Sequence, residues 1–537
     1  MTSSITRKSR LLRWGLYLFI ALAIYAALSL IWESYRFRQT IPDQRWNPQI
    51  ARIVGLVLVN LLFTAAIAVL AALYFWVRMA SGLPDLQAWH HDYPRSEFCE
   101  QDAHDGYTLD DYFAQEARVF EELHTFISGP WVEPARGAYC KYCPSSICNP
   151  ETVLERNWNR SFLLEAPQPI GGALLVHGLS DSPYSVRALG QRLHAEGYTV
   201  LWLRVPGHGT NPGALAQSSS EDWFAALKVA MRGLKGRLPA GAPLLVGGYS
   251  NGAALGVLYA LSALDDPSLP KPGALILLAP MIGINPLASL MRLYHTVALV
   301  SRNQKAQWQS IEAEFDPFRY GSWPMNASVQ AWRVTRAIER GLAKLEAAGR
   351  VGDMPPIFAA QSVVDSTIVV SKLITTLFDR LKSPSSELLL YDINRMSQIA
   401  NLFNRSFEKA VFPKLERNDL PYTLTLLTNV SPDSSRIAIR TRAGDLSTET
   451  PTDMAWPDGV VSLSHLAVPI PPEDPIYGTR EATAATGLSI GTLSVRAEPS
   501  ALLINNVLFS RCRHNPFYRF TEDRILSWLN RVIRRSN

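Results

Sequence analysis

The chain has 537 residues, which is long for one domain, so two or more structural units are expected. It is rich in apolar residues (47%) and poor in charged ones (18%), which indicates membrane segments. The net charge of +5 is small for this length, and no basic stripe is interleaved with aromatic residues, so a nucleic acid is not expected as a partner. Five cysteines are too few for a disulfide scaffold.

Residues 1–81 are expected to form a membrane anchor. Two uncharged runs, 14–32 and 53–77, are each long enough to cross a hydrocarbon core, and together they predict a two-helix transmembrane hairpin. The first run alone would also fit a signal peptide, but the second run favours the hairpin and a multi-pass protein of the cell membrane. The basic residues around both runs narrowly favour a cytoplasmic location for the rest of the chain.

Residues 82–169 are expected to be an irregular linker with one helix, 109–127. This region contains four of the five cysteines: Cys99, Cys140, Cys143 and Cys148. A C-x-x-C pair beside a third cysteine could hold zinc if Cys99, His90, His91 or His104 supplied the fourth ligand. Free thiols, or two disulfides in an oxidising compartment, are the alternatives. Disulfides would conflict with a cytoplasmic location.

Residues 170–537 are expected to form one α/β domain, because apolar strands alternate with helical segments. The expected strands are 172–176, 199–205, 243–247, 274–279 and 357–360. The expected helices are 186–196, 222–234, 251–263 and 522–533. The alternation breaks at 281–354, which is rich in aromatic residues and is expected to be an inserted lid. A second insertion is expected at 396–456, with one strand at 423–428, and 468–500 is expected to be extended.

The stretch Gly247-Gly248-Tyr249-Ser250-Asn251-Gly252 has the G-x-S-x-G pattern of a nucleophile elbow. Ser250 stands at the turn between an apolar strand and a small-residue helix, and the flanking glycines let backbones pass closely. The amides that begin the helix would face an oxyanion formed at Ser250. The pentapeptide alone also fits a glycine-rich turn, but the strand before it and the helix after it favour a nucleophile at Ser250.

Four motifs together resemble the α/β-hydrolase family. They are LLVHGLSDSP (174–183), RVPGHG (204–209), GGYSNG (247–252) and VVDSTI (363–368). Within that family the chain looks like the branch of monoacylglycerol lipases, lysophospholipases, carboxylesterases and serine aminopeptidases. The resemblance implies an α/β-hydrolase fold, a mostly parallel sheet with flanking helices and an inserted lid. It also implies a serine, an acid and a histidine in that chain order, with no metal or organic cofactor.

The candidate general base is His465. Only two other histidines follow Ser250 in the chain, His295 and His514. His295 falls in the expected lid, before any acid at a strand end, so the chain order excludes it. His514 lies beside the expected terminal helix, where a surface or capping role is the natural interpretation. The alternative for His465 is an ordinary loop histidine.

The candidate acid is Asp365, which follows the expected strand 357–360 as the family's acid does. Asp392 is the rival, because it also ends a strand-like run, whereas Asp353 precedes its strand. A surface turn aspartate is the alternative for Asp365.

The resemblance implies an oxyanion hole formed by the backbone amides of Leu179 and Asn251. Two histidines in the matching loops, His177 and His208, are expected to organise those loops rather than to catalyse.

These residues predict a membrane-anchored serine hydrolase of carboxylic esters with a lipid-like substrate of monoacylglycerol or lysophospholipid type. The anchor would hold the site near a bilayer, and the lid could line an acyl pocket. A serine aminopeptidase of the same fold is an alternative, with Glu312, Glu314 or Asp316 holding the substrate's amino terminus. A membrane scaffold that has lost catalysis is the other.

Overall fold

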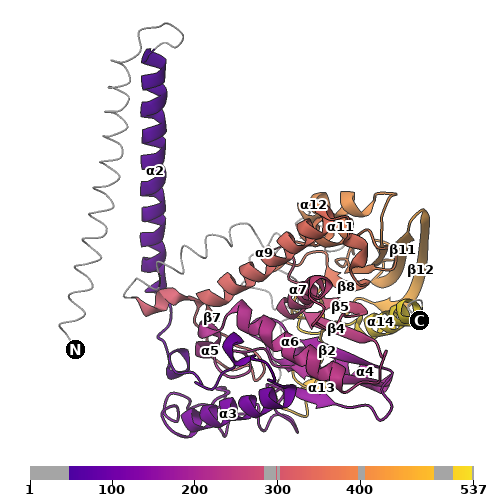
Figure 1. Cartoon of the computed structure of the whole chain (residues 1–537), viewed down its shortest axis with the longest axis horizontal. Coiled ribbons are helices and arrows are strands. Elements are labelled where there is room, and N and C mark those ends of the chain that lie inside the picture. The colour runs from indigo at the N-terminus through magenta and orange to yellow at the C-terminus, as the bar shows by residue number, and fades with distance from the viewer. Residues whose placement is uncertain (1–47, 284–297, 299–302, 397–405, 489–511, 535–537) are drawn as a thin grey trace, which may run out of the picture. The chain divides into compact units, whose positions relative to one another are not determined.

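A computed structural model describes residues 48–283, 298, 303–396, 406–488 and 512–534 (Figure 1). The chain divides into two units, 1–82 and 83–537.

The first unit contains the helix α2, Pro48–Ala80. Its segment Val54–Ala80 is long and apolar enough to cross a membrane, and side chains along it such as Leu61 and Leu62 are exposed. It is the one such helix in the described part of the chain, and it covers the expected span 53–77. The other expected span, 14–32, lies outside the described residues.

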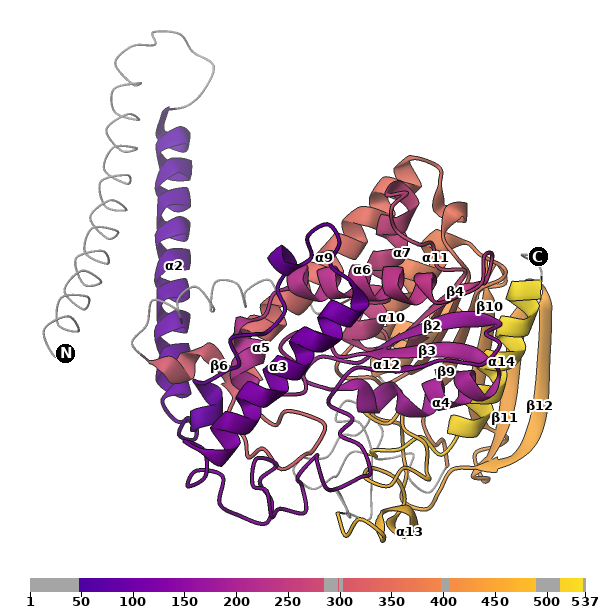
Figure 2. The ribbon, with the colours of Figure 1, turned by 60° about the horizontal axis from the view of Figure 1, so that its bottom comes forward.

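The second unit is built on a ten-stranded sheet with the order β1-β3-β2-β4-β5-β8-β9-β10-β11-β12 (Figure 2). The run from β3 to β10 is parallel throughout, and β1, β11 and β12 are antiparallel additions at the two edges. The strand bounds are β1 Phe162–Leu164, β2 Gly171–Val176, β3 Tyr198–Leu203, β4 Leu244–Tyr249, β5 Ala274–Leu278, β8 Ile357–Ser362, β9 Glu387–Tyr391, β10 Thr423–Asn429, β11 Arg436–Ala443 and β12 Leu446–Ala455. The expected mostly parallel sheet is confirmed.

Helices cover both faces of the sheet, because the central strands are apolar on both faces. In β2, Leu174 and Val176 face one core while Ala173 and Leu175 face the other. The first core packs against α6, α7 and α9, and the second against α4 and α14 (Figure 2). The helix bounds are α4 Arg187–Ala195, α6 Ser220–Gly236, α7 Asn251–Asp265, α9 Met325–Ala347 and α14 Tyr518–Arg534.

The expected lid differs from the structure in its second half. There α9 forms the crossover between the parallel strands β5 and β8 and packs along α7. Its Val334, Ile338 and Leu342 recur at helical spacing and are buried in the main core. A parallel connection requires such a helix, so helix-forming residues here do not indicate a lid. Residues 303–324 carry a short 3-10 helix, η5 Gln304–Gln307, and two short strands, β6 Trp308–Ser310 and β7 Trp323–Pro324.

The expected insertion at 396–456 also differs, because much of it extends the sheet. The strand β10 pairs in parallel with β9 and continues the main sheet, and the β11–β12 hairpin is added beyond it. The hairpin was not predicted because β12 is polar and largely exposed along its length. A helix, α12 (Ser406–Leu415), precedes these strands. Residues 468–488 form turns and the short helix α13 (Arg480–Thr483), not an extended segment.

The region 83–169 packs into the same unit as the sheet. Its helix α3, Leu109–Ser128, matches the expected 109–127 and begins at a capping box between Thr108 and Asp111. Trp89, Trp131 and Tyr142 are buried in a small aromatic core of this region. This part of the chain is therefore folded against the α/β body and is not a free linker.

Candidate active site

Ser250 occupies a strained turn between β4 and α7. Its backbone has φ 53° and ψ −113°, a left-handed conformation that non-glycine residues rarely adopt. A Cβ on Gly252 would lie 2.1 Å from the Val176 carbonyl oxygen, and one on Gly248 would lie 2.4 Å from the Gly252 carbonyl carbon. Both glycines are thus required by close backbone approach, as the G-x-S-x-G pattern predicts.

Three predicted residues meet at this turn. His465 Nε2 lies 2.9 Å from Ser250 Oγ, and His465 Nδ1 lies 2.6 Å from Asp365 Oδ2. All three residues are buried. They come from three separate places in the chain: the end of β4, the loop after β8 and the loop before α13. A carboxylate only accepts hydrogen bonds, so in this pairing His465 carries its proton on Nδ1 and its Nε2 accepts from the Ser250 hydroxyl.

Asp392, the rival acid, belongs to a different cluster. Its carboxylate pairs with Arg395 and accepts a hydrogen bond from the Thr428 hydroxyl at 2.7 Å. Its contacts therefore hold β9, β10 and the following loop together.

The Asp365 carboxylate is held by four donors. The backbone amides of Thr367 and Ile368 donate to Oδ1 at 2.8 and 2.9 Å. Oδ2 accepts from His465 and from the side-chain amide of Gln361. These donors fix the direction of the carboxylate. Gln361 was not predicted, and its signal in the sequence is only a polar residue near the end of an apolar strand.

The loop 177–179 lies against the nucleophile turn. A Cβ on Gly178 would be 2.8 Å from the Tyr249 ring and 3.4 Å from Ser250 Cβ. Leu179 and Asn251, from the two loops that meet here, are both buried. Among the described residues neither of their backbone N–H groups has a protein acceptor. The site thus holds two available donors of the kind that an oxyanion hole requires.

His177 and His208 hold the loops around Ser250. The Val205 amide donates to His177 Nε2 at 3.0 Å, and His177 Nδ1 donates to the Gly178 carbonyl at 2.8 Å. The His177 and His208 rings are both buried and pack edge to face at 4.9 Å. Burial lowers the pKa of His177 to about 3 and places the pKa of His208 well below its usual value. These contacts agree with the expected role in loop organisation.

Buried neutral histidines should make the fold sensitive to acid. His90 is buried against Ser322, and desolvation lowers its pKa to about 4. Because the pKa values of His90 and His177 lie below 6.5 in the folded state, the unfolded chain binds more protons as the pH falls below 6.5. We expect the free energy of unfolding to fall by about 2 kcal/mol for each of them between pH 8 and pH 5.

Urea unfolding of the full chain in detergent at the two pH values measures this loss. The variant His90→Gln should show a smaller loss, by about 2 kcal/mol, because it removes one of the buried neutral histidines. An equal loss in wild type and variant would contradict the prediction.

The carboxylates considered for an aminopeptidase have other partners. Glu314 is buried, lies 3.5 Å from Lys141 and accepts from the amides of Gly321 and Ser322. Asp316 accepts from the Tyr477 hydroxyl and pairs with Arg513 at 3.3 Å. Glu312 is exposed. Both buried carboxylates are thus already balanced by the protein's own donors.

The cysteines of region 83–169 do not pair in the structure. Cys99, Cys140, Cys143 and Cys148 are free thiols, and Cys148 is buried. Across the described residues, no group of three or more histidine, cysteine, aspartate and glutamate side chains is placed to hold a metal ion.

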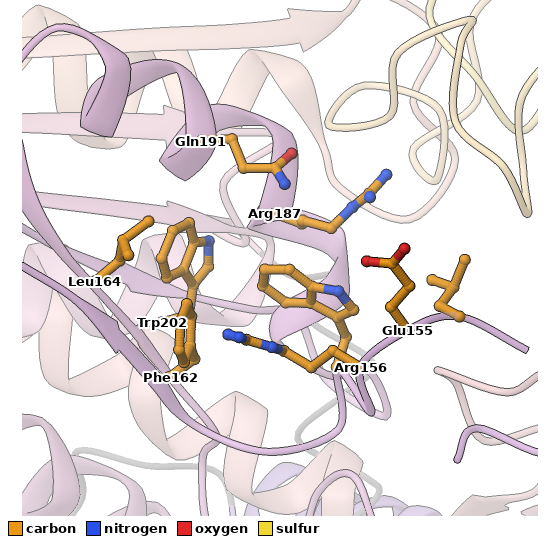
Figure 3. Close-up of a pocket in the computed structure, with 9 residues that line it drawn as sticks. Glu155, Arg156, Phe162, Leu164, Arg187, Gln191 and Trp202 are labelled. Atoms are coloured by element: carbon orange, nitrogen blue, oxygen red, sulfur yellow. The ribbon is translucent and has the colours of Figure 1, made fainter. Parts of the chain in front are cut away.

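A separate cavity of 540 Å³ opens at the β1 edge of the sheet (Figure 3). It is lined by Leu154, Glu155, Arg156, Trp158, Phe162, Leu164, Arg187, Gln191 and Trp202. The Arg156 guanidinium stacks 3.5 Å from the centre of the Phe162 ring. None of the lining residues belongs to the Ser250 cluster, and the lining offers no serine, cysteine or histidine.

Part of this chain is similar to known lipases. A curated relative, the thermostable monoacylglycerol lipase of Bacillus sp. (strain H-257), is 36% identical over 84 residues, 16% of this chain and 32% of the relative. The chain therefore matches about a third of that relative's length. Among solved structures, a monoacylglycerol lipase of Paleococcus ferrophilus is 18% identical with a TM-score of 0.33, covering 43% of this chain and 89% of that one. A monoglyceride lipase of Saccharomyces cerevisiae is 16% identical with a TM-score of 0.33, covering 43% and 82%.

The family match spans the sheet from before β2 to the end of β9. Residues 167–392 match the Hydrolase_4 family, described as serine aminopeptidase, S33, and this segment contains Ser250, Asp365 and both candidate oxyanion loops. Residues 167–392 of this chain thus belong to that family of α/β hydrolases.

Proposed function

We propose that the chain is a membrane-anchored serine hydrolase that cleaves carboxylic esters through an acyl-enzyme. The observation that carries the proposal is the hydrogen-bonded series from Ser250 Oγ through His465 to Asp365. This arrangement is the one that activates a serine hydroxyl as a nucleophile.

Each group has a role in the proposed reaction. Ser250 Oγ attacks the acyl carbon while its proton passes to His465 Nε2, and the Asp365 carboxylate stabilises the imidazolium. The amides of Leu179 and Asn251 donate to the oxyanion of the tetrahedral intermediate. His465 then protonates the departing alcohol, and a water molecule, deprotonated by His465, releases the carboxylic acid and restores Ser250.

The proposed substrate is a lipid-like ester of monoacylglycerol or lysophospholipid type. The exposed apolar helix α2 supports it, because such a helix would hold the enzyme at a bilayer. The curated relative is named as a monoacylglycerol lipase. A second span at 14–32, a multi-pass arrangement and a cytoplasmic active site remain part of the proposal, supported by the apolar runs and the basic residues around them.

Two other functions make different predictions. An aminopeptidase would need an unpaired carboxylate for the substrate's amino terminus, and the buried Glu314 and Asp316 are already paired. An inactive scaffold would have no reason to retain a strained serine beside an oriented histidine.

The test uses the full chain in detergent micelles. We expect a fluorophosphonate probe to label Ser250 in the wild type and to leave Ser250→Ala unlabelled. The wild type should turn over p-nitrophenyl esters, monoacylglycerols and lysophospholipids, and should not turn over aminoacyl anilides. Turnover of anilides alone would favour the aminopeptidase, and a folded protein that is not labelled would favour the scaffold.

Gln361 should influence the rate through Asp365. The variant Gln361→Leu removes one donor to the catalytic carboxylate, so we expect kcat to fall about tenfold with little change in KM. Gln361→Glu should be slower still, because two adjacent carboxylates cannot both ionise easily. Both are measured with a soluble p-nitrophenyl ester.

The matched control is Gln330→Leu. Gln330 is also buried, but its partners are Ser220, Asn326 and Arg333, none of which contacts Asp365. The kcat of the Gln330→Leu variant should stay within a factor of about two of the wild-type kcat. Equal losses in the two leucine variants would show that Gln361 acts only through stability.

A further inference from the structure

Arg319 joins the two loops that form the candidate oxyanion hole. Its guanidinium donates to Asp181 Oδ2 at 3.1 Å and to the Tyr249 hydroxyl at 3.3 Å. Asp181 lies two residues after Leu179, and Tyr249 directly precedes Ser250. One side chain therefore ties the loop after β2 to the turn after β4.

The same connection reaches the general base. The Tyr249 hydroxyl donates to the His465 carbonyl oxygen at 3.4 Å, and the two rings pack with centres 5.3 Å apart. Next to Arg319, the Tyr320 amide donates to the Ser180 carbonyl at 2.8 Å, which adds a backbone link to the oxyanion loop. The nucleophile, the oxyanion loop and the base thus share one neighbour, the segment around Arg319.

Lys141 holds that segment in place from outside the family match. Its ammonium donates to the Arg319 carbonyl at 2.8 Å and lies 3.5 Å from the Glu314 carboxylate, and its amide donates to the Glu314 carbonyl at 2.9 Å. The adjacent Tyr142 hydroxyl donates to the Thr210 carbonyl at 3.2 Å. Lys141 and Tyr142, both buried, therefore hold the Arg319 loop against the α/β body.

The chemistry of arginine suits this position. Its planar guanidinium presents several donors at fixed angles, so it can hold a carboxylate and a hydroxyl at once. The pair with Asp181 is nearly dry, with side-chain exposures of 16% and 2%, so its geometry is not loosened by water. A lysine would keep the charge but lose the fixed two-acceptor geometry.

We propose that Arg319 is a positioning residue that holds the oxyanion loop and the Ser250 turn in their catalytic geometry, and that Lys141 anchors it. The inference rests on the proposed ester hydrolysis and extends it. It assigns part of the active-site support to residues 140–142, which lie outside the family match at 167–392.

The test compares Arg319→Met with Arg187→Met in the full chain. The Arg187–Asp474 pair matches the Arg319–Asp181 pair in distance, 3.0 against 3.1 Å, and in both exposures, 16% and 2%. Fluorophosphonate titration to completion counts competent sites, so that kcat is expressed per folded site. We expect Arg319→Met to lower kcat about 100-fold with little change in KM, because small misplacements of reacting groups have effects of this size. Arg187→Met should change kcat per site by less than about threefold.

Two conservative variants keep the test decisive if Arg319→Met does not fold. Tyr249→Phe removes only the hydroxyl that bonds Arg319, and should lower kcat per site about fivefold. Arg319→Lys should be slower than the wild type and faster than Arg319→Met. Two results would overturn this inference alone, provided that the wild type is active. They are an Arg319→Met variant no slower than Arg187→Met, or a Tyr249→Phe variant as fast as the wild type. A wild type that neither labels nor turns over esters would overturn the proposed function, and this inference with it.

Discussion

Ser250→Ala, His465→Ala and the double variant should each lower kcat for ester hydrolysis by about the same factor, on the order of 10⁶. The serine can attack only when its proton is accepted, and the acceptor His465 Nε2 lies 2.9 Å from Ser250 Oγ. Removing either partner therefore removes the same reaction path, and removing the second adds nothing. Steady-state rates with a soluble p-nitrophenyl ester, corrected for spontaneous hydrolysis, measure all three.

His514→Gln is the control for the histidine. His514 is buried like His465, but its Nδ1 lies 3.3 Å from the Tyr477 carbonyl oxygen. In the described structure, Ser250 is not among its hydrogen-bond partners. Its kcat should remain within a few-fold of the wild type. If His465→Ala kept more than about one hundredth of the wild-type rate, another base would have to serve Ser250.

The candidate site was predictable where the chemistry imposes a local pattern or a chain order. The turn at Ser250 needs glycine on both sides, so it is visible as G-x-S-x-G, and the structure shows those glycines in close backbone contact. Asp365 follows a buried strand directly. His465 lies 100 residues later and has no local signature, and only the order of serine, acid and histidine selects it.

The supporting residues could not be predicted, because their roles depend on neighbours that are distant in the sequence. Arg319 contacts residues 70 and 138 positions away, and Lys141 contacts Arg319 across 178. A polar side chain in an irregular loop carries no periodic signal that would reveal such partners. The sequence predicts a lid where the crossover helix α9 lies for a related reason, since the apolar stripe of α9 fits either role until its packing against α7 is known.

Asp365→Asn should lower kcat about 10⁴-fold, because it would change which ring nitrogen of His465 carries the proton. The amides of Thr367 and Ile368 donate to Oδ1, so an asparagine would place its carbonyl oxygen there. Its NH₂ group would then occupy the place of Oδ2, facing His465 Nδ1. Two donors cannot face each other, so the histidine would carry its proton on Nε2 and could not accept one from Ser250. The measurement is kcat per fluorophosphonate-titrated site.

Asp392→Asn separates this mechanism from the general loss of a buried carboxylate. Asp392 is as deeply buried as Asp365, and it pairs with Arg395 instead of a histidine. Its loss should reduce stability, since Arg395 keeps only one of its two carboxylate partners, Glu408, but kcat per titrated site should stay within a few-fold of the wild type. If Asp392→Asn were the slower of the two per site, the acid of the series would be Asp392. Equal and small losses in both would mean that His465 is oriented without a carboxylate. The backbone donors around Asp365 argue against that outcome, because they hold its carboxylate aimed at the ring.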